Sequence, residues 1–250
     1  MPNKGKQILT VWGSPSSGKT VTAVKIAREL SMSKKNIAVV FCDAICPTLP
    51  TVLKTKTPIE GSAGAVLAAP AITQEHILKN SVCPSKNPYI TFLGYKAGEN
   101  VFTYAEYTRE RAVDLLVLLR HIADYVVVDC SSSLTDSILS TTALEMADTV
   151  LRLGSCDPKS VSYFMSCLPL IADHRFRQEK HIRVLSDIKP RQDSNGYENA
   201  FGGVLYKLPH VEAIEEQVYS LSLLEGLSGK DAKAYEPVIR RIAEEVFGNG

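Results

Sequence analysis

Gly13-Ser14-Pro15-Ser16-Ser17-Gly18-Lys19-Thr20 is the stretch that decides the fold of this chain. It follows an apolar run at residues 8–12, which predicts a β-strand, and precedes residues 21–30, whose apolar positions recur at helical spacing. In the pattern G-x-x-x-x-G-K-T, the glycines let the backbone turn closely, so that successive N–H groups point at phosphates. The lysine reaches the β- and γ-phosphates, the threonine offers its hydroxyl to Mg²⁺, and the helix N-terminus adds positive partial charge. The stretch, together with Val21, is therefore predicted to bind a nucleotide.

Two aspartates stand at the ends of apolar runs. Residues 37–42 read as a strand covered on both faces and end in Asp43, and residues 124–129 read as another strand that ends in Asp129. Ligands of open α/β sheets bind outside the carboxyl ends of the strands, and Asp129 has the position of the Walker B acid of P-loop proteins. Asp43 and Asp129 are therefore candidate Mg²⁺ ligands together with Thr20, with a turn-capping or helix-capping role as the alternative for each aspartate.

Strand-like and helix-like segments alternate along the rest of the chain. The predicted helices lie at residues 62–67, 72–79, 104–122, 137–146, 160–171, 212–219 and 232–247. The predicted strands lie at residues 89–94, 149–153, 181–185 and 203–206, and loops are expected at 44–56 and 189–199. The alternation predicts a doubly wound, mostly parallel α/β sheet with helices on both faces, in a single P-loop nucleotide-binding domain over residues 1–250.

Composition and charge limit the classes of function. The 250 residues carry a formal net charge of +1, so no global field favours nucleic acid or an anionic membrane as an obligatory partner. The six cysteines show no C-x-x-C pair, which suits reduced thiols rather than a metal cluster, and Cys42 and Cys46 read as thiols of this kind. No run approaches the length of a membrane span, and the N-terminus has no apolar signal region. These features predict a cytoplasmic protein.

The motifs also bear on which nucleotide is bound. GTPases carry an N-K-x-D motif late in the chain, and this sequence has none, which favours ATP over GTP. Small-molecule kinases add an arginine-rich lid to the P-loop. The nearest basic cluster here, at residues 175–191, lies far along the chain, so a phosphotransferase is kept as an alternative.

With these features in view, the whole chain resembles the MinD/ParA family of P-loop ATPases. Ala147-Asp148-Thr149-Val150 is similar to the family's lead into a strand, and residues 203–210 are similar to the segment that lies near the adenine. The resemblance implies ATP or ADP with Mg²⁺ as cofactors. It also implies that Leu208, Pro209 and His210 lie beside the base.

Three departures from the family pattern concern hydrolysis. Ser14 stands where most of the family has a lysine that reaches a dimer partner's phosphates, and a serine cannot deliver that charge. Ile45 stands where the family has a second aspartate, and residues 129–133 lack the glycine of the second switch. These changes predict nucleotide binding with weak or partner-dependent hydrolysis, for which Lys19 and Asp43 are the candidate catalytic residues.

The P-loop text and residues 93–100, L-G-Y-K-A-G-E-N, look like those of the pilus-assembly branch, the CpaE/TadZ-like ATPases. That resemblance implies a nucleotide-dependent switch that positions or assembles a larger machine, with an unidentified protein partner and a nucleotide-dependent homodimer as an open alternative. A non-hydrolysing scaffold and an ATP-dependent DNA-partitioning protein are further alternatives.

Two charged segments are read as parts of the domain rather than as binding surfaces. The basic residues at 174–183 are expected to form a solvated helix face, with contact to DNA phosphates as the alternative. The last predicted helix mixes acidic and basic residues on its polar side, which favours packing on the domain over membrane binding.

Overall fold

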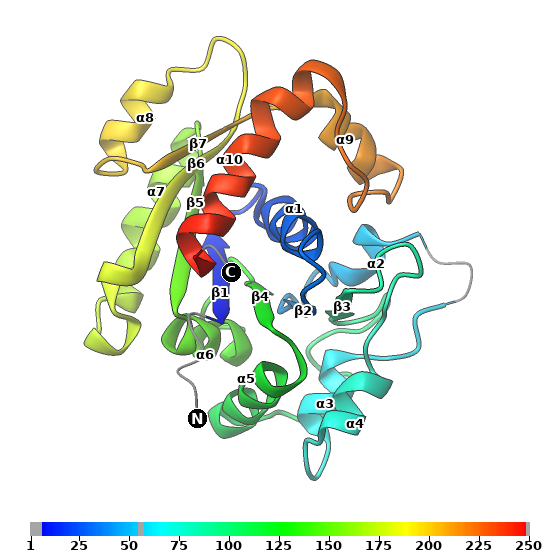
Figure 1. Ribbon diagram of the computed structural model, residues 1–250. Coiled ribbons are helices and arrows are strands. Elements are labelled where there is room, and N and C mark those ends of the chain that lie inside the picture. The colour runs from blue at the N-terminus through cyan, green and yellow to red at the C-terminus, as the bar shows by residue number, and fades with distance from the viewer. Residues whose placement is uncertain (1–6, 55–57, 249–250) are drawn as a thin grey trace.

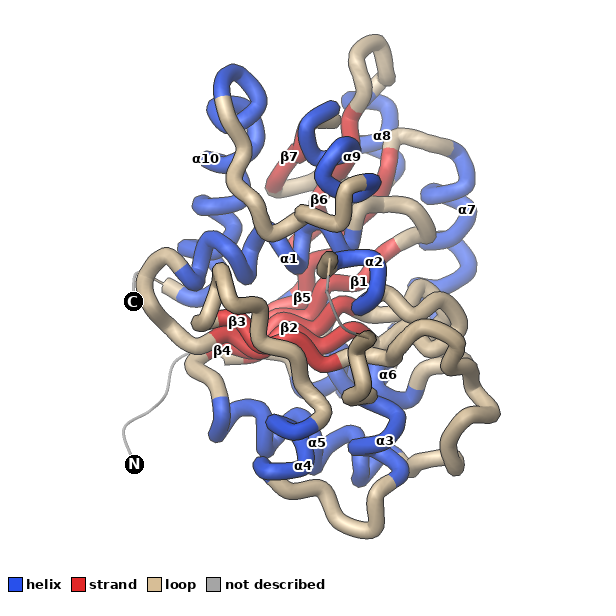
Figure 2. Tube along the Cα trace, turned by 90° about the vertical axis from the view of Figure 1, so that its right-hand side faces the viewer, coloured by secondary structure: helices blue, strands red, loops and turns tan. Residues whose placement is uncertain are grey.

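The computed structural model describes residues 7–54 and 58–248. In this part of the chain, seven strands form one sheet in the order β3-β2-β4-β1-β5-β6-β7, and every neighbouring pair is parallel (Figures 1 and 2). The strands are β1 (Ile8–Gly13), β2 (Ile37–Phe41), β3 (Ile90–Leu93), β4 (Tyr125–Asp129), β5 (Thr149–Ser155), β6 (His181–Ile188) and β7 (Tyr206–Pro209). The predicted α/β sheet is confirmed, and β1 lies at its centre between β4 and β5.

Helices cover both faces of this sheet (Figure 2). One face carries α1 (Lys19–Ser31), α9 (Glu212–Tyr219) and α10 (Gly229–Phe247). The other face carries α3 (Ala63–Ala68), α4 (Gln74–Lys79), α5 (Arg109–Ile122), α6 (Ile138–Met146) and α7 (Pro158–Cys167). Two further helices, α2 (Leu49–Val52) and α8 (Ser194–Ala200), lie in the connections, and 3₁₀ turns span Leu168–Ile171, His174–Phe176 and Gln178–Lys180.

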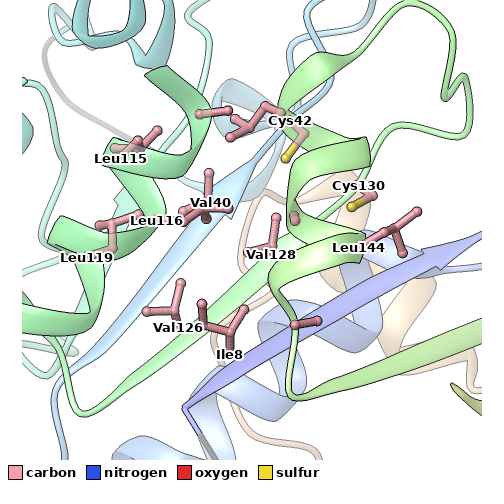
Figure 3. Packing of buried hydrophobic residues seen from close by; sticks show 14 of the residues in the cluster. Ile8, Val40, Cys42, Leu115, Leu116, Leu119, Val126, Val128, Cys130 and Leu144 are labelled. Atoms are coloured by element: carbon pink, nitrogen blue, oxygen red, sulfur yellow. The ribbon is translucent and has the colours of Figure 1, made fainter. Parts of the chain in front are cut away.

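Two layers of apolar side chains fill the space between sheet and helices. Successive residues of a strand point to opposite faces, so Ile8 packs in one layer and Leu9 in the other. In the first layer, Val40 and Val126 point toward the leucines of α5 (Figure 3). Because the central strands are covered on both sides, they have the continuous apolar sequences from which they were predicted.

Two predicted boundaries were wrong near polar side chains. The helix expected from residue 104 begins at Arg109, because the preceding residues form a loop in which the Tyr104 hydroxyl donates to Glu99 Oε1 at 2.6 Å. The loop expected at 189–199 contains α8, whose first turn is capped by Asp193, since its Oδ1 accepts from Gly196 N at 3.0 Å.

The strand expected at 203–206 lies further along the chain. It runs instead over Tyr206–Pro209, because Gly202 and Gly203 both have positive φ and form a turn before it. Pro209 is tolerated since β7 is the edge strand of the sheet. The expected loop at 44–56 includes α2, and residues 55 and 56 of it lie outside the described residues.

The basic segment before β6 is not a solvated helix face as expected. It forms 3₁₀ turns around the buried Phe176, and two of its cations cap the C-terminus of α6. Arg177 Nη2 donates to Ala147 O at 3.0 Å, and Lys180 Nζ donates to Glu145 O and Ala147 O at 3.0 Å each. Cations at this helix end complete its free carbonyls and interact favourably with its dipole.

The last helix packs on the domain, as predicted. Ile239, Ile242 and Val246 of α10 are buried in the layer shared with α1. None of the helices described here is both long and apolar enough to cross a membrane.

Candidate nucleotide-binding site

The loop between β1 and α1 lies at the carboxyl end of the sheet, where it wraps close to β5. A side chain at Gly13 would collide with the carbonyl oxygen of Leu153, so the close approach of β5 requires glycine. Gly18, with φ of 74°, provides the left-handed turn that leads into α1. Ser186 of β6 supports the loop from the other side, because its hydroxyl donates to Ser17 O at 2.7 Å.

Lys19 extends back over this loop. Its ammonium group donates to Ser14 O at 3.1 Å and to Ser132 Oγ at 2.6 Å. Burial lowers the pKa of Lys19, and the nearby charge of Asp129 opposes this shift. The ammonium is therefore held inside the loop by oxygen atoms, which the oxygens of a phosphate can replace.

Asp129 and Thr20 meet at the end of β4. The hydroxyl of Thr20 donates to Asp129 Oδ2 at 2.6 Å, and the buried Asp129 Oδ1 has no hydrogen-bond partner within the described residues. Burial raises the pKa of Asp129 to about 6, although the Thr20 bond and the Lys19 charge act in the opposite direction. An unpartnered carboxylate oxygen beside a hydroxyl is an oxygen-ligand set of the kind that Mg²⁺ takes, so these residues fit the ion.

Asp43 follows β2 on the same edge of the sheet. Its Oδ1 accepts from Ile45 N at 2.9 Å and from Cys46 N at 2.8 Å, which is the turn-capping role. The residue before it, Cys42, donates its backbone N–H to Asp129 O at 2.9 Å, so Asp43 follows directly after a contact with the end of β4. The structure thus brings Asp43 to the site, whereas its role toward Mg²⁺ or in catalysis stays a prediction.

A cavity of about 240 Å³ opens beside the loop. Gly18 and Val21 line it on one side, and Pro209 and His210 line it on another. Leu208, which the family resemblance places beside the base, packs in the hydrophobic core with 1% exposure. The physical reason is the alternation of side chains along β7, which turns neighbouring residues to opposite faces.

Sequence reasoning missed further residues around this cavity. They include Asp187, which follows the apolar part of β6, and Tyr219 and Tyr235 from α9 and α10. Asp187 Oδ1 lies 2.6 Å from His210 Nδ1 and thereby orients that ring. Asp187 could have been found by the signal that identified Asp43 and Asp129, an aspartate near the end of an apolar strand.

Ser14 points into the protein rather than across the surface of the loop. Its side chain is 1% exposed, and its Oγ lies 2.8 Å from Ser160 Oγ of α7. One turn further along α7, the Tyr163 hydroxyl donates to Ser132 O at 2.7 Å. Helix α7 therefore contacts both the phosphate loop and the segment after Asp129, through residues that no local sequence signal identifies.

A lysine at position 14 is expected to be incompatible with this packing. Ser14→Lys should lower the free energy of unfolding by about 2–3 kcal/mol, because it overfills a buried position and breaks the bond to Ser160. Urea unfolding measures the change, with Ser16→Lys as the control, since Ser16 is exposed in the same loop and its replacement should have little effect. Equal stability of the Ser14→Lys protein and the wild type would contradict the buried placement of Ser14.

Comparisons with known proteins agree with this architecture. No model of a protein family matches the sequence, and no curated protein matches it significantly. Among solved structures, a ParA-family ATPase from Chlorobium tepidum TLS is 18% identical, with a TM-score of 0.76 over 95% of this chain and 98% of its own. The cell-division ATPase MinD from Pyrococcus furiosus is 17% identical, with a TM-score of 0.71 over 96% and 98%.

A further similar structure contains a nucleotide. The septum site-determining protein MinD from Pyrococcus horikoshii OT3, complexed with Mg-ADP, is 15% identical, with a TM-score of 0.69 over 96% of this chain and 95% of its own. The chain therefore has the fold of the MinD and ParA P-loop ATPases.

Proposed function

We propose that this protein binds ATP and ADP with Mg²⁺ at residues 13–21 and acts as a nucleotide-dependent switch of MinD/ParA type. The observation that carries the proposal is the convergence of Lys19, Thr20 and Asp129 on one phosphate-binding loop. The Mg-ADP complex of the similar MinD from Pyrococcus horikoshii supports the choice of ligand.

Each group has a distinct role in this proposal. The N–H groups of the loop and the Lys19 ammonium hold the phosphates, and Thr20 and Asp129, with Asp43 nearby, hold the metal ion. Bound Mg²⁺ neutralises charge on the phosphate oxygens. The cavity beside Pro209 and His210 takes the base.

Hydrolysis is proposed to be weak or dependent on a partner. Lys19 remains the residue that stabilises charge on the transferring phosphate, and Asp43 is the candidate that orients water. The neutral Ser14 is buried against Ser160, so it supplies no charge to a second molecule. The same observation favours the second candidate function, a nucleotide-binding scaffold that does not hydrolyse ATP.

The switch itself is proposed to involve the segments after Asp43 and Asp129. In the structure Ser132 holds the Lys19 ammonium at 2.6 Å. Binding of a phosphate would draw Lys19 away from Ser132, and Tyr163 would carry the change to α7. The proposed switch acts with a protein partner, forms a homodimer and takes part in pilus assembly. The proposed location is the cytoplasm, where the six free cysteines would stay reduced.

Nucleotide titration tests the proposal. Fluorescent ATP and ADP analogues should bind the wild type saturably and in a Mg²⁺-dependent manner, and unlabelled ATP should compete better than GTP. Absence of nucleotide binding would overturn the proposed function. Nucleotide binding without release of phosphate would favour the non-hydrolysing scaffold as the function. Transfer of phosphate to a small acceptor would instead favour a phosphotransferase.

Mass in solution distinguishes the oligomeric alternatives. A dimer that forms with a non-hydrolysable ATP analogue but not with ADP would support the switch reading despite Ser14. DNA binding that requires ATP and weakens with salt would instead indicate DNA partitioning.

A further inference from the structure

A second group of basic side chains lies within the sheet, away from the phosphate loop. Arg152 of β5 and Arg183 of β6 are register partners, and His181 lies two residues before Arg183. Because strand side chains alternate, all three point to the face on which α7 packs. The ring of Phe164 from α7 lies 5.6 Å from Arg152 Cζ and marks this face.

The positive charges of this cluster lack acidic partners. Within the described residues, the Arg152 guanidinium makes no hydrogen bond and has no carboxylate oxygen within 4.0 Å, and Arg183 Nη1 donates to the carbonyl of Phe201 at 3.1 Å. Burial lowers the pKa of Arg152 to about 10, with the charge of Arg183 as the second cause. His181 carries no charge at neutral pH, because burial lowers its pKa to about 4. Its Nε2 lies 3.2 Å from Phe176 O, and its buried Nδ1 has no partner in the described part of the chain.

Other basic residues of the protein do have acidic partners. Arg109 and Arg175 both pair with Glu145, and Lys207 pairs with Glu198 at 2.6 Å. Like charges directly opposite on adjacent strands destabilise a sheet, and half-buried charges need a compensating group. An anion between the two guanidinium groups would supply that compensation.

We propose that Arg152 and Arg183, with His181 beside them, form a binding site for a small phosphate-bearing anion, separate from the nucleotide site. Two planar guanidinium groups pair bidentately with phosphate oxygens. The site is partly buried beside the rings of Phe164 and Phe201, whose centroids are 5.2 Å apart. This partial burial and the net charge of +1 favour a small anion over a nucleic acid backbone.

Phosphate binding tests the site directly, once the P-loop is disabled. In a Lys19→Ala protein, equilibrium dialysis with radiolabelled inorganic phosphate should show one saturable site, and phosphate should raise the unfolding temperature above that in chloride at equal ionic strength. Arg152→Gln/Arg183→Gln in the same background should weaken phosphate binding at least tenfold and remove the phosphate-specific rise. Absence of saturable binding in the Lys19→Ala protein would overturn the proposal.

A matched control separates this site from general charge effects. Arg241 of α10 also stacks on a ring, with its Cζ 5.9 Å from the centroid of Tyr206, but it is exposed. Arg241→Gln should leave phosphate binding unchanged, and a loss equal to that of the double variant would contradict the assignment. If the double variant does not fold, Arg152→Lys keeps the charge and removes the planar fork, and it should still weaken binding measurably. Displacement of phosphate by short duplex DNA would overturn the small-anion assignment in favour of nucleic acid.

Discussion

Replacement of Lys19 with methionine is expected to lower the affinity for ATP by about 100-fold while leaving the nucleotide-free protein folded. Removal of one partner from a buried, hydrogen-bonded charge pair costs about 3 kcal/mol of binding free energy, which corresponds to about 100-fold. The nucleotide-free protein should tolerate the change, because burial already lowers the pKa of Lys19 and thus disfavours its charged form. The methionine fills a similar volume without that cost.

Calorimetric titration with ATP and Mg²⁺ measures the affinity, and urea unfolding measures the stability. Lys34→Met is the control, since Lys34 is exposed beyond the end of α1 and its replacement removes the same charge away from the loop. Unchanged ATP affinity in the Lys19→Met protein would show that the loop is not the nucleotide site. If the Lys19→Met protein did not fold, the prediction that the nucleotide-free protein tolerates methionine at this position would be wrong.

Replacement of Asp129 with asparagine is expected to stabilise the nucleotide-free protein at neutral pH and to abolish the Mg²⁺ dependence of nucleotide binding. The pKa of Asp129 is raised from 3.8 to about 6 by burial, so the folded state holds its proton more tightly than the unfolded state. The resulting stabilisation is fully present below pH 3.8 and is lost as the pH rises through about 6. Above that range the ionised carboxylate costs the fold about 3 kcal/mol relative to the protonated form.

Asparagine removes this charge, so the expected gain in unfolding free energy is about 2 kcal/mol at about pH 8 and small at about pH 4. The gain is less than the full cost, because one amide atom still lacks a partner in the position of Asp129 Oδ1. Urea unfolding at both pH values, together with ATP titrations with and without Mg²⁺, checks both effects. Asp124→Asn, at the opposite end of β4, should alter neither the pH dependence nor the response to Mg²⁺. If the Asp129→Asn protein were less stable than the wild type at about pH 8, the conclusion that the buried, unpartnered carboxylate destabilises the fold would be wrong.

Much of the fold could be predicted because its signals are local. The apolar runs of β2 and β4 predict strands that are buried on both faces. The helical spacing of apolar residues in α1, α9 and α10 predicts helices that pack on these strands. Errors arose where a polar contact or a turn set the boundary, as at Arg109 and at Gly202 and Gly203, because propensity does not report such contacts. The burial of Leu208 could not be predicted, because a similarity of segments does not determine which face of a strand a side chain takes.

By itself, the sequence determined the phosphate loop and the acid of β4. The loop is a contiguous segment whose glycines and helix start orient its own N–H groups, and the acid is marked by the run that it ends. Only the tertiary structure decided that Ser14 is buried against Ser160 and that Arg152 lies beside Arg183. These partners come from separate elements, so their contacts depend on strand order, register and helix packing, and no local pattern of residues encodes them.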